Sequence, residues 1–161
     1  MPDAPVPPAF RALDVAGETG NDYPAEFAGA SAPRIKRRLG DHGGLSNYGV
    51  NHVTLPPGCA STIRHWHTLQ DEFVMVLSGE VVLITDAGEQ VLRPGECAAF
   101  PAGRPDGHGL VNRADSPATY LEIGDRTAGD EVDYPDIDMA VRWIDGVEVY
   151  VRRSDGTPYD R

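Results

Sequence analysis

The chain has 161 residues, enough for one domain with a substantial hydrophobic core. Lysine and arginine total 14 against 25 aspartate and glutamate residues, and the net charge of −11 argues against a nucleic-acid partner. The one basic cluster, formed by Arg34, Lys36, Arg37 and Arg38, is interpreted as a solvated loop or strand edge, with a phosphate-binding patch as the alternative. No apolar run reaches the ~20 residues of a membrane helix, and residues 1–8 lack the features of a signal peptide. We therefore expect a cytoplasmic protein without a membrane partner.

Short strands and turns dominate the pattern along the chain. Residues 1–33 are rich in Pro, Ala, Gly and Asp and indicate an extended arm. After Tyr48, Gly- and Pro-containing turns separate short apolar runs, which predict strands at 48–55, 61–67, 72–77, 80–85, 89–92, 96–100, 108–112 and 118–123. Residues 136–142 fit either a short helix or a strand, and Asp145-Gly146 predicts a tight hairpin in the tail. This pattern leaves sandwiches, jelly rolls and small barrels as folds.

Two further features bear on assembly and redox state. The run Phe73 to Leu77 is apolar on both alternating faces, so its outer face needs cover from the arm, the tail hairpin or a second subunit. We expect a homodimer to which the arms contribute. Cys59 and Cys97 lie in apolar contexts and are expected to be buried free thiols, with one disulfide as the alternative.

A group of histidines and one glutamate carries the chemistry. His65 and His67 are separated by one residue, which in a strand places both imidazoles on one face. Glu72 follows after four residues, enough for a turn that brings it beside the pair. A His-x-His pair alone is more often a surface feature than a metal site. The added carboxylate, and His108 near another glycine turn, favour a metal site.

The spacing around these residues resembles the cupin superfamily. Gly58, six residues, His65-Trp66-His67, four residues, Glu72, six residues and Gly79 resemble its first motif. Gly95, Pro101-Ala102-Gly103, His108 and Asn112 resemble its second motif. The first motif here has one residue more before His65, and the turn before His108 is two residues longer than is usual, as in one bacterial subgroup. The resemblance implies an all-β fold, a single cupin jelly-roll β-barrel with an N-terminal arm (1–39), the barrel (40–126) and a C-terminal extension with a hairpin (127–161).

The resemblance also implies a metal site. His65, His67, Glu72 and His108 would be inward-facing ligands of one divalent transition metal, Mn²⁺, Fe²⁺, Ni²⁺, Co²⁺ or Zn²⁺. Strand alternation from these ligands places Ser61, Ile63, Val74, Val76, Leu110 and Asn112 inside and predicts mainly apolar walls without Arg or Lys. Tyr48, His52, Asp106 and Glu122 are candidates for groups that support the ligands.

Function is less specified than fold. Some members of the similar subgroup are described as sugar-phosphate isomerases, which implies a metalloenzyme that isomerises or epimerises a small polar metabolite. The acidic charge and the predicted lack of inner cations argue against a phosphate; only Arg104 and Arg113 would lie near the mouth. A non-catalytic binding or sensing module and a metal-dependent dioxygenase are the alternatives. The sequence therefore leaves open whether the chain is an enzyme and assigns no catalytic residue.

Overall fold

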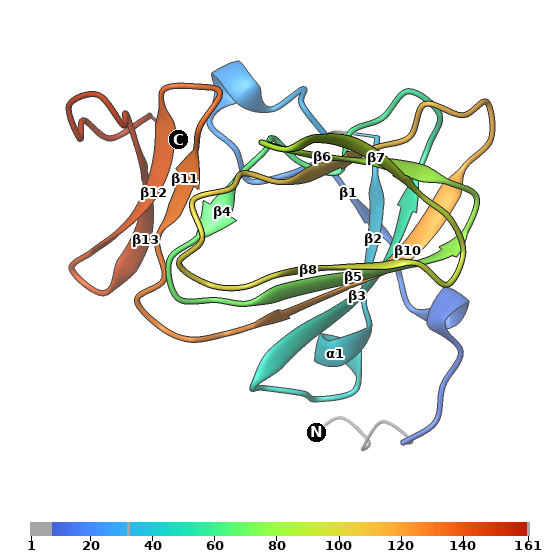
Figure 1. Ribbon diagram of the computed structural model, residues 1–161. Helices are drawn as coiled ribbons and strands as arrows, with labels where there is room; N and C mark the ends of the chain where they lie inside the picture. The colour runs from blue at the N-terminus through green and yellow to red at the C-terminus, as the bar shows by residue number, and fades with distance from the viewer. Residues whose placement is uncertain (1–7, 32, 161) are drawn as a thin grey trace.

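The computed structural model describes residues 8–31 and 33–160 and consists almost entirely of β-strands (Figure 1). Its largest sheet has the order β1-β2-β3-β10-β5-β8, and a three-stranded sheet has the order β7-β6-β9. Their bounds are β1 Glu18–Thr19, β2 Ile35–Arg38, β3 Tyr48–Leu55, β5 Glu72–Ser78, β6 Val81–Thr85, β7 Gly88–Leu92, β8 Cys97–Phe100, β9 Gly109–Val111 and β10 Ala118–Asp125. The two sheets face each other in Figure 1, as two layers of an all-β domain.

A third sheet lies at one end of these two layers (Figure 1). It has the order β13-β12-β11-β4, with β4 at Trp66–His67, β11 at Val132–Tyr134, β12 at Met139–Ile144 and β13 at Val147–Val151. Asp145 and Gly146 both have positive φ, 51° and 83°, as the predicted hairpin turn requires. Residues 136–142, which fitted a helix or a strand, contribute to β12.

Two apolar cores stabilise the domain. The first joins the facing sheets and contains Val53, Leu55, Val74, Val76, Val81, Leu83, Leu92, Leu110 and Tyr120. The second joins the C-terminal sheet to the N-terminal segment, where Tyr23 and Phe27 pack against Val132, Met139 and Val141. The helices are short, α1 at Leu39–His42 and two 3₁₀ turns at Ala12–Asp14 and Ala25–Phe27, and no described helix could cross a membrane.

The predicted strand at 61–67 is wrong over most of its length. Only Trp66–His67 is regular, while the preceding segment touches the β9 region through Ser61 N–H to Leu110 O and through a bridge between His65 and His108. The four residue steps from Ser61 to His65 therefore lie opposite only two steps, from Leu110 to His108, so the segment from Ser61 to His65 bulges. The bulge breaks the alternation, and Ile63 packs on the C-terminal core rather than inside the barrel.

Two expectations about exposure are corrected. The basic cluster is only in part a loop or solvated edge. Arg34 precedes β2 and Arg38 is exposed, whereas Lys36 is half-buried between β1 and β3, opposite the fully buried Val53. Cys59 is a buried free thiol as expected, whereas Cys97 is free but exposed on β8.

Candidate metal centre

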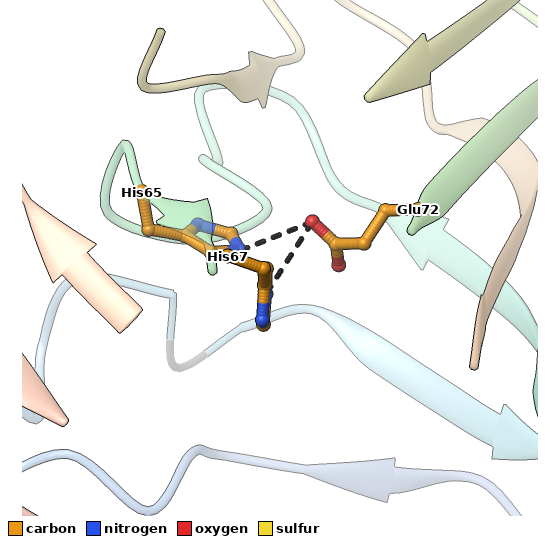
Figure 2. Close-up of side chains that lie close together, drawn as sticks. All are labelled: His65, His67 and Glu72. Carbon is orange, nitrogen blue, oxygen red and sulfur yellow. Dashed lines mark ion pairs between the residues drawn. The ribbon is translucent and has the colours of Figure 1, made fainter. Parts of the chain in front are cut away.

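Three segments bring the predicted ligands together. His65 and His67 come from the bulged segment and β4, Glu72 opens β5, and His108 precedes β9, where its backbone bridges to His65. Figure 2 shows the His65 and His67 rings directed at the Glu72 carboxylate. The ligand atoms of these three residues all lie within 4.8 Å of one another.

One carboxylate oxygen is the meeting point. Glu72 Oε2 lies 3.4 Å from His65 Nε2 and 3.5 Å from His67 Nε2. It lies 2.6 Å from Nε2 of His108, whose ring stacks on Phe100 at a centroid distance of 3.6 Å. All four sequence-predicted residues therefore converge, and His108 approaches the oxygen most closely.

The outer ring nitrogens set the direction of the lone pairs. His65 Nδ1 lies 2.9 Å from the Ile63 carbonyl oxygen, which can only accept, so Nδ1 carries the proton. His67 Nδ1 lies 2.5 Å from Asp130 Oδ2. In the neutral tautomers, both Nε2 lone pairs then face the anionic Glu72 oxygen, an arrangement that needs a shared cation. The donor set thus fits a divalent metal ion, as nitrogen and carboxylate ligands suit transition metals.

The pKa directions describe the same cluster in its metal-free form. Burial by itself would raise the pKa of the Glu72 carboxyl, but hydrogen bonds with His108 and His65 hold it well below 4.5. Burial also opposes the charged form of His65, yet Glu72 outweighs it and raises the pKa above 6.5. At His108 burial dominates and lowers the pKa below 6.5. A proton on the His65 imidazole thus partly supplies the positive charge that a metal would bring.

Asp130 is the supporting residue that the sequence did not reveal. It is buried, accepts from His67, and its Oδ1 also accepts the Leu69 and Gln70 N–H groups at 2.7 and 3.2 Å. One carboxylate therefore fixes both the His67 ring and the turn that leads to Glu72. It lies 63 residues from His67, so no local spacing pointed to it.

Of the four supporting candidates named from sequence, Glu122 alone lines the cavity that also contains His65, His67 and Glu72, which we call the inner cavity. Tyr48 is 45% exposed, and Asp106 instead accepts the Asp86 N–H. His52 lies opposite Arg37, one residue out of step with the inward Val53. These three therefore do not face the inner cavity.

The inner cavity has a volume of about 490 Å³ and polar walls, whereas the sequence predicted mainly apolar walls. Besides His65, His67 and Glu72 it is lined by Arg34, Lys36, Arg38, Glu122, Asp130 and Tyr134, among others. Alternation along β2 directs every second basic side chain inward. The inner cavity is therefore polar and contains cations.

Ion pairs order these cations. Lys36 Nζ lies 2.8 Å from Glu122 Oε1, which also accepts from Asn51 at 3.1 Å, and Arg38 pairs with Glu18 at 2.9 Å. Arg34 donates to the Ser61 carbonyl at 2.6 Å, and its buried Nε has no partner among the described residues. Arg34 thus contributes positive charge to the inner cavity.

The two arginines expected near the mouth lie elsewhere. Arg113 forms a double hydrogen bond with the exposed Glu89 at 2.5 and 2.6 Å, and Arg104 lines a separate space of about 90 Å³ behind His67 and His108. Neither lines the inner cavity.

Comparison with known proteins identifies the family. Residues 51–124 match the model of the cupin domain. A solved structure from Silicibacter pomeroyi, described as a sugar phosphate isomerase from a cupin superfamily, is 45% identical over 93% of this chain and 96% of its own, with a TM-score of 0.88. The chain belongs to the cupin superfamily. The predicted cupin jelly-roll barrel with arm and hairpin is thereby confirmed.

Two further cupin-like structures are similar. A putative sugar phosphate isomerase from Acidithiobacillus ferrooxidans is 31% identical over 76% of this chain and 78% of its own, with a TM-score of 0.71. A polyketide cyclase from Streptomyces resistomycificus is 22% identical over 73% and 78%, with a TM-score of 0.61, and supports the fold alone. No curated protein matches this cupin.

Proposed function

We propose that this cupin is a metal-dependent isomerase of a phosphorylated sugar. The observation that carries the proposal is one cavity holding both the His65–His67–Glu72 group and the Arg34 guanidinium. A metal ligand set and a phosphate-binding cation are the two recognition elements that such a substrate needs. The isomerase descriptions of the two relatives more than 30% identical support the same reaction class.

His65, His67, Glu72 and His108 would hold the metal. When bound, a divalent ion supplies Lewis-acid polarisation of a carbonyl or hydroxyl oxygen of the sugar. The ordered Nδ1 contacts of His65 and His67 keep their Nε2 atoms directed at the site.

Glu122 is the group that moves the proton. Burial would raise the pKa of its carboxyl, but Lys36 and Arg34 outweigh burial and keep it below 4.5. The carboxyl is therefore ionised at neutral pH and able to accept a proton. It removes the proton from the hydroxyl-bearing carbon beside the carbonyl and returns it to the former carbonyl carbon. The proton of that hydroxyl passes to the former carbonyl oxygen, so an aldose becomes a ketose without net proton loss.

Arg34 orients the substrate by binding its phosphate. Its guanidinium lines the inner cavity and is held by the Ser61 carbonyl. An arginine fork suits phosphate oxygens. Binding at Arg34, the residue before β2, would position the sugar between the phosphate site and the metal ligands.

The test is turnover of aldose and ketose phosphates by protein purified without a histidine tag, with Mn²⁺, Fe²⁺, Ni²⁺, Co²⁺ and Zn²⁺ added separately. Glu122→Gln should lower kcat about 10²-fold or more while metal content is retained. Glu80→Gln, at an exposed Glu80–Arg93 pair, is the matched control.

Two results would contradict the proposal. Full activity of Glu122→Gln would show that Glu122 is not the base. Absence of turnover with every metal, together with ligand-induced thermal stabilisation, would favour a binding module, and oxygen consumption with Fe²⁺ would favour a dioxygenase.

A further inference from the structure

A second cavity lies beside the inner cavity. This outer cavity, about 740 Å³, is lined by Trp143, Val147, Val149 and Tyr159 among other residues. It shares five lining residues with the inner cavity, namely Asp22, Tyr23, Val141, Glu148 and Tyr150. The cavity that holds the metal ligands and the cavity that holds Trp143 are therefore adjacent and share part of their walls.

The strand register explains why the two cavities are adjacent. His67 on β4 pairs with Val132, Val132 with Val141, and Val141 with Tyr150. Directly opposed residues in antiparallel strands point to the same face, so this row leads from a metal ligand across four strands. Trp143 lies two residues beyond Val141 and pairs with Glu148, which places both on that face.

The chemistry of the outer cavity differs from that of the inner one. Trp143 is 40% exposed and offers an aromatic face, while Asp22, Glu148 and Asp160 contribute carboxylates. In contrast to the inner cavity, its lining contains no Arg or Lys among the described residues. Phosphate is therefore disfavoured there.

A neutral sugar ring matches these groups. Its C–H face packs on an aromatic side chain, and its rim hydroxyls donate to carboxylate oxygens. The inner cavity, about 490 Å³, is already within the usual size of a small-ligand site, so a monosaccharide phosphate leaves the outer cavity unfilled.

We propose that the outer cavity binds a second, neutral sugar ring on Trp143, so that the substrate is a disaccharide whose reducing ring carries the phosphate. This inference rests on the proposed function for the phosphate end. It deepens that function by naming the substrate class.

Calorimetric titration tests the proposal with three probes: maltose phosphorylated at O6 of its reducing ring, glucose 6-phosphate and maltose. The phosphorylated maltose should bind about fivefold more tightly than glucose 6-phosphate. Trp143→Ala should remove this advantage and leave glucose 6-phosphate affinity unchanged, whereas Trp143→Phe should keep most of it. Ile144→Ala is the matched control, since Ile144 neighbours Trp143 in β12, is not among the residues that line the outer cavity and is similarly exposed, at 39%.

Equal affinities of the two phosphates, or an unchanged advantage in Trp143→Ala, would overturn the proposal. A monomer–dimer shift in Trp143→Ala without loss of sugar binding would assign the surface to an interface between copies and also overturn it. If neither phosphate binds, the proposed function fails separately. In that case maltose binding that Trp143→Ala abolishes still supports the outer site, and no maltose binding overturns it.

Discussion

Asp130 shows how much of the metal centre depends on a single side chain outside the ligand set. Its carboxylate holds the His67 ring from behind and also fixes the backbone of the turn between His67 and Glu72. Ligand orientation and loop geometry are thus coupled through one buried residue.

Asp130→Asn should weaken metal binding about 10- to 100-fold, because the amide lacks the charge that orients His67. Competition with a metal indicator measures this change. Asp133→Asn is the matched control. Asp133 lies on β11, opposite Trp66 of β4, and pairs with Arg142 at 2.7 Å instead of with a metal ligand. Equal loss in both variants would contradict a specific role for Asp130.

The raised pKa of His65 predicts a pH-dependent stabilisation by metal. Without metal, the protonated His65 stabilises the fold below pH 6.5, and this contribution is lost as the pH rises through the higher folded value. Glu72, with its lowered pKa, contributes stability above pH 4.5 that is lost only on further acidification. Metal must displace the His65 proton, so the metal-induced increase in Tm should be larger at pH 8 than at pH 6. An increase that is equal or larger at pH 6 would contradict this coupling.

Local spacing was enough to bring His65, His67 and Glu72 together, because one residue separates the two histidines and one tight turn leads from His67 to Glu72. Asp130 could not be predicted, since it reaches His67 only through the pairing of β11 with β4. Glu122 was named from sequence, but its orientation could not be fixed without the neighbouring Lys36 and Asn51.

At the scale of elements, β2 changes the interpretation of the cavity. Its Ile-Lys-Arg-Arg sequence lacks the apolar alternation that marks a half-buried strand, so no strand was predicted there. Once the strand is known, the alternating direction of successive side chains places Lys36 toward the inner cavity and Arg37 away from it. The bulge between Ser61 and His65 likewise depends on a partner, β9, that is distant in sequence.

Two motif glycines should differ in their tolerance of alanine. Gly58 and Gly79 have similar positive φ, 72° and 70°, but only at Gly79 would an added Cβ meet backbone atoms, Ala118 Cα and Pro117 O, both at 2.9 Å. Gly58→Ala should cost about 1 kcal/mol of unfolding free energy, and Gly79→Ala about 3 kcal/mol or more. Urea denaturation measures both. Equal losses would show that φ alone governs these positions.

For the whole molecule, the arrangement of three sheets explains why the site lies where it does. The C-terminal sheet contributes His67 through β4, the six-stranded sheet contributes Glu72 through β5, and His108 precedes β9 of the three-stranded sheet. The proposed metal would therefore connect all three sheets. The division into residues 1–39, 40–126 and 127–161 stays a prediction.

The homodimer also stays a prediction. On β5, Val74 and Val76 are buried inward, while Phe73 and Met75 are half-buried and Leu77 is 39% exposed on the outer face. If a second subunit covers this face, sedimentation should give a dimer at micromolar concentration, and Leu77→Glu should give a monomer. A monomeric unmodified protein would contradict the prediction.

Metal analysis of untagged protein tests the central claim most directly. The unmodified chain should carry one divalent transition-metal ion, and His65→Ala, Glu72→Gln and His108→Ala should each lose it while retaining the strand-rich circular dichroism spectrum. A metal-free protein that fails to bind any of the five ions when they are added, or stoichiometric metal in all three variants, would contradict the account.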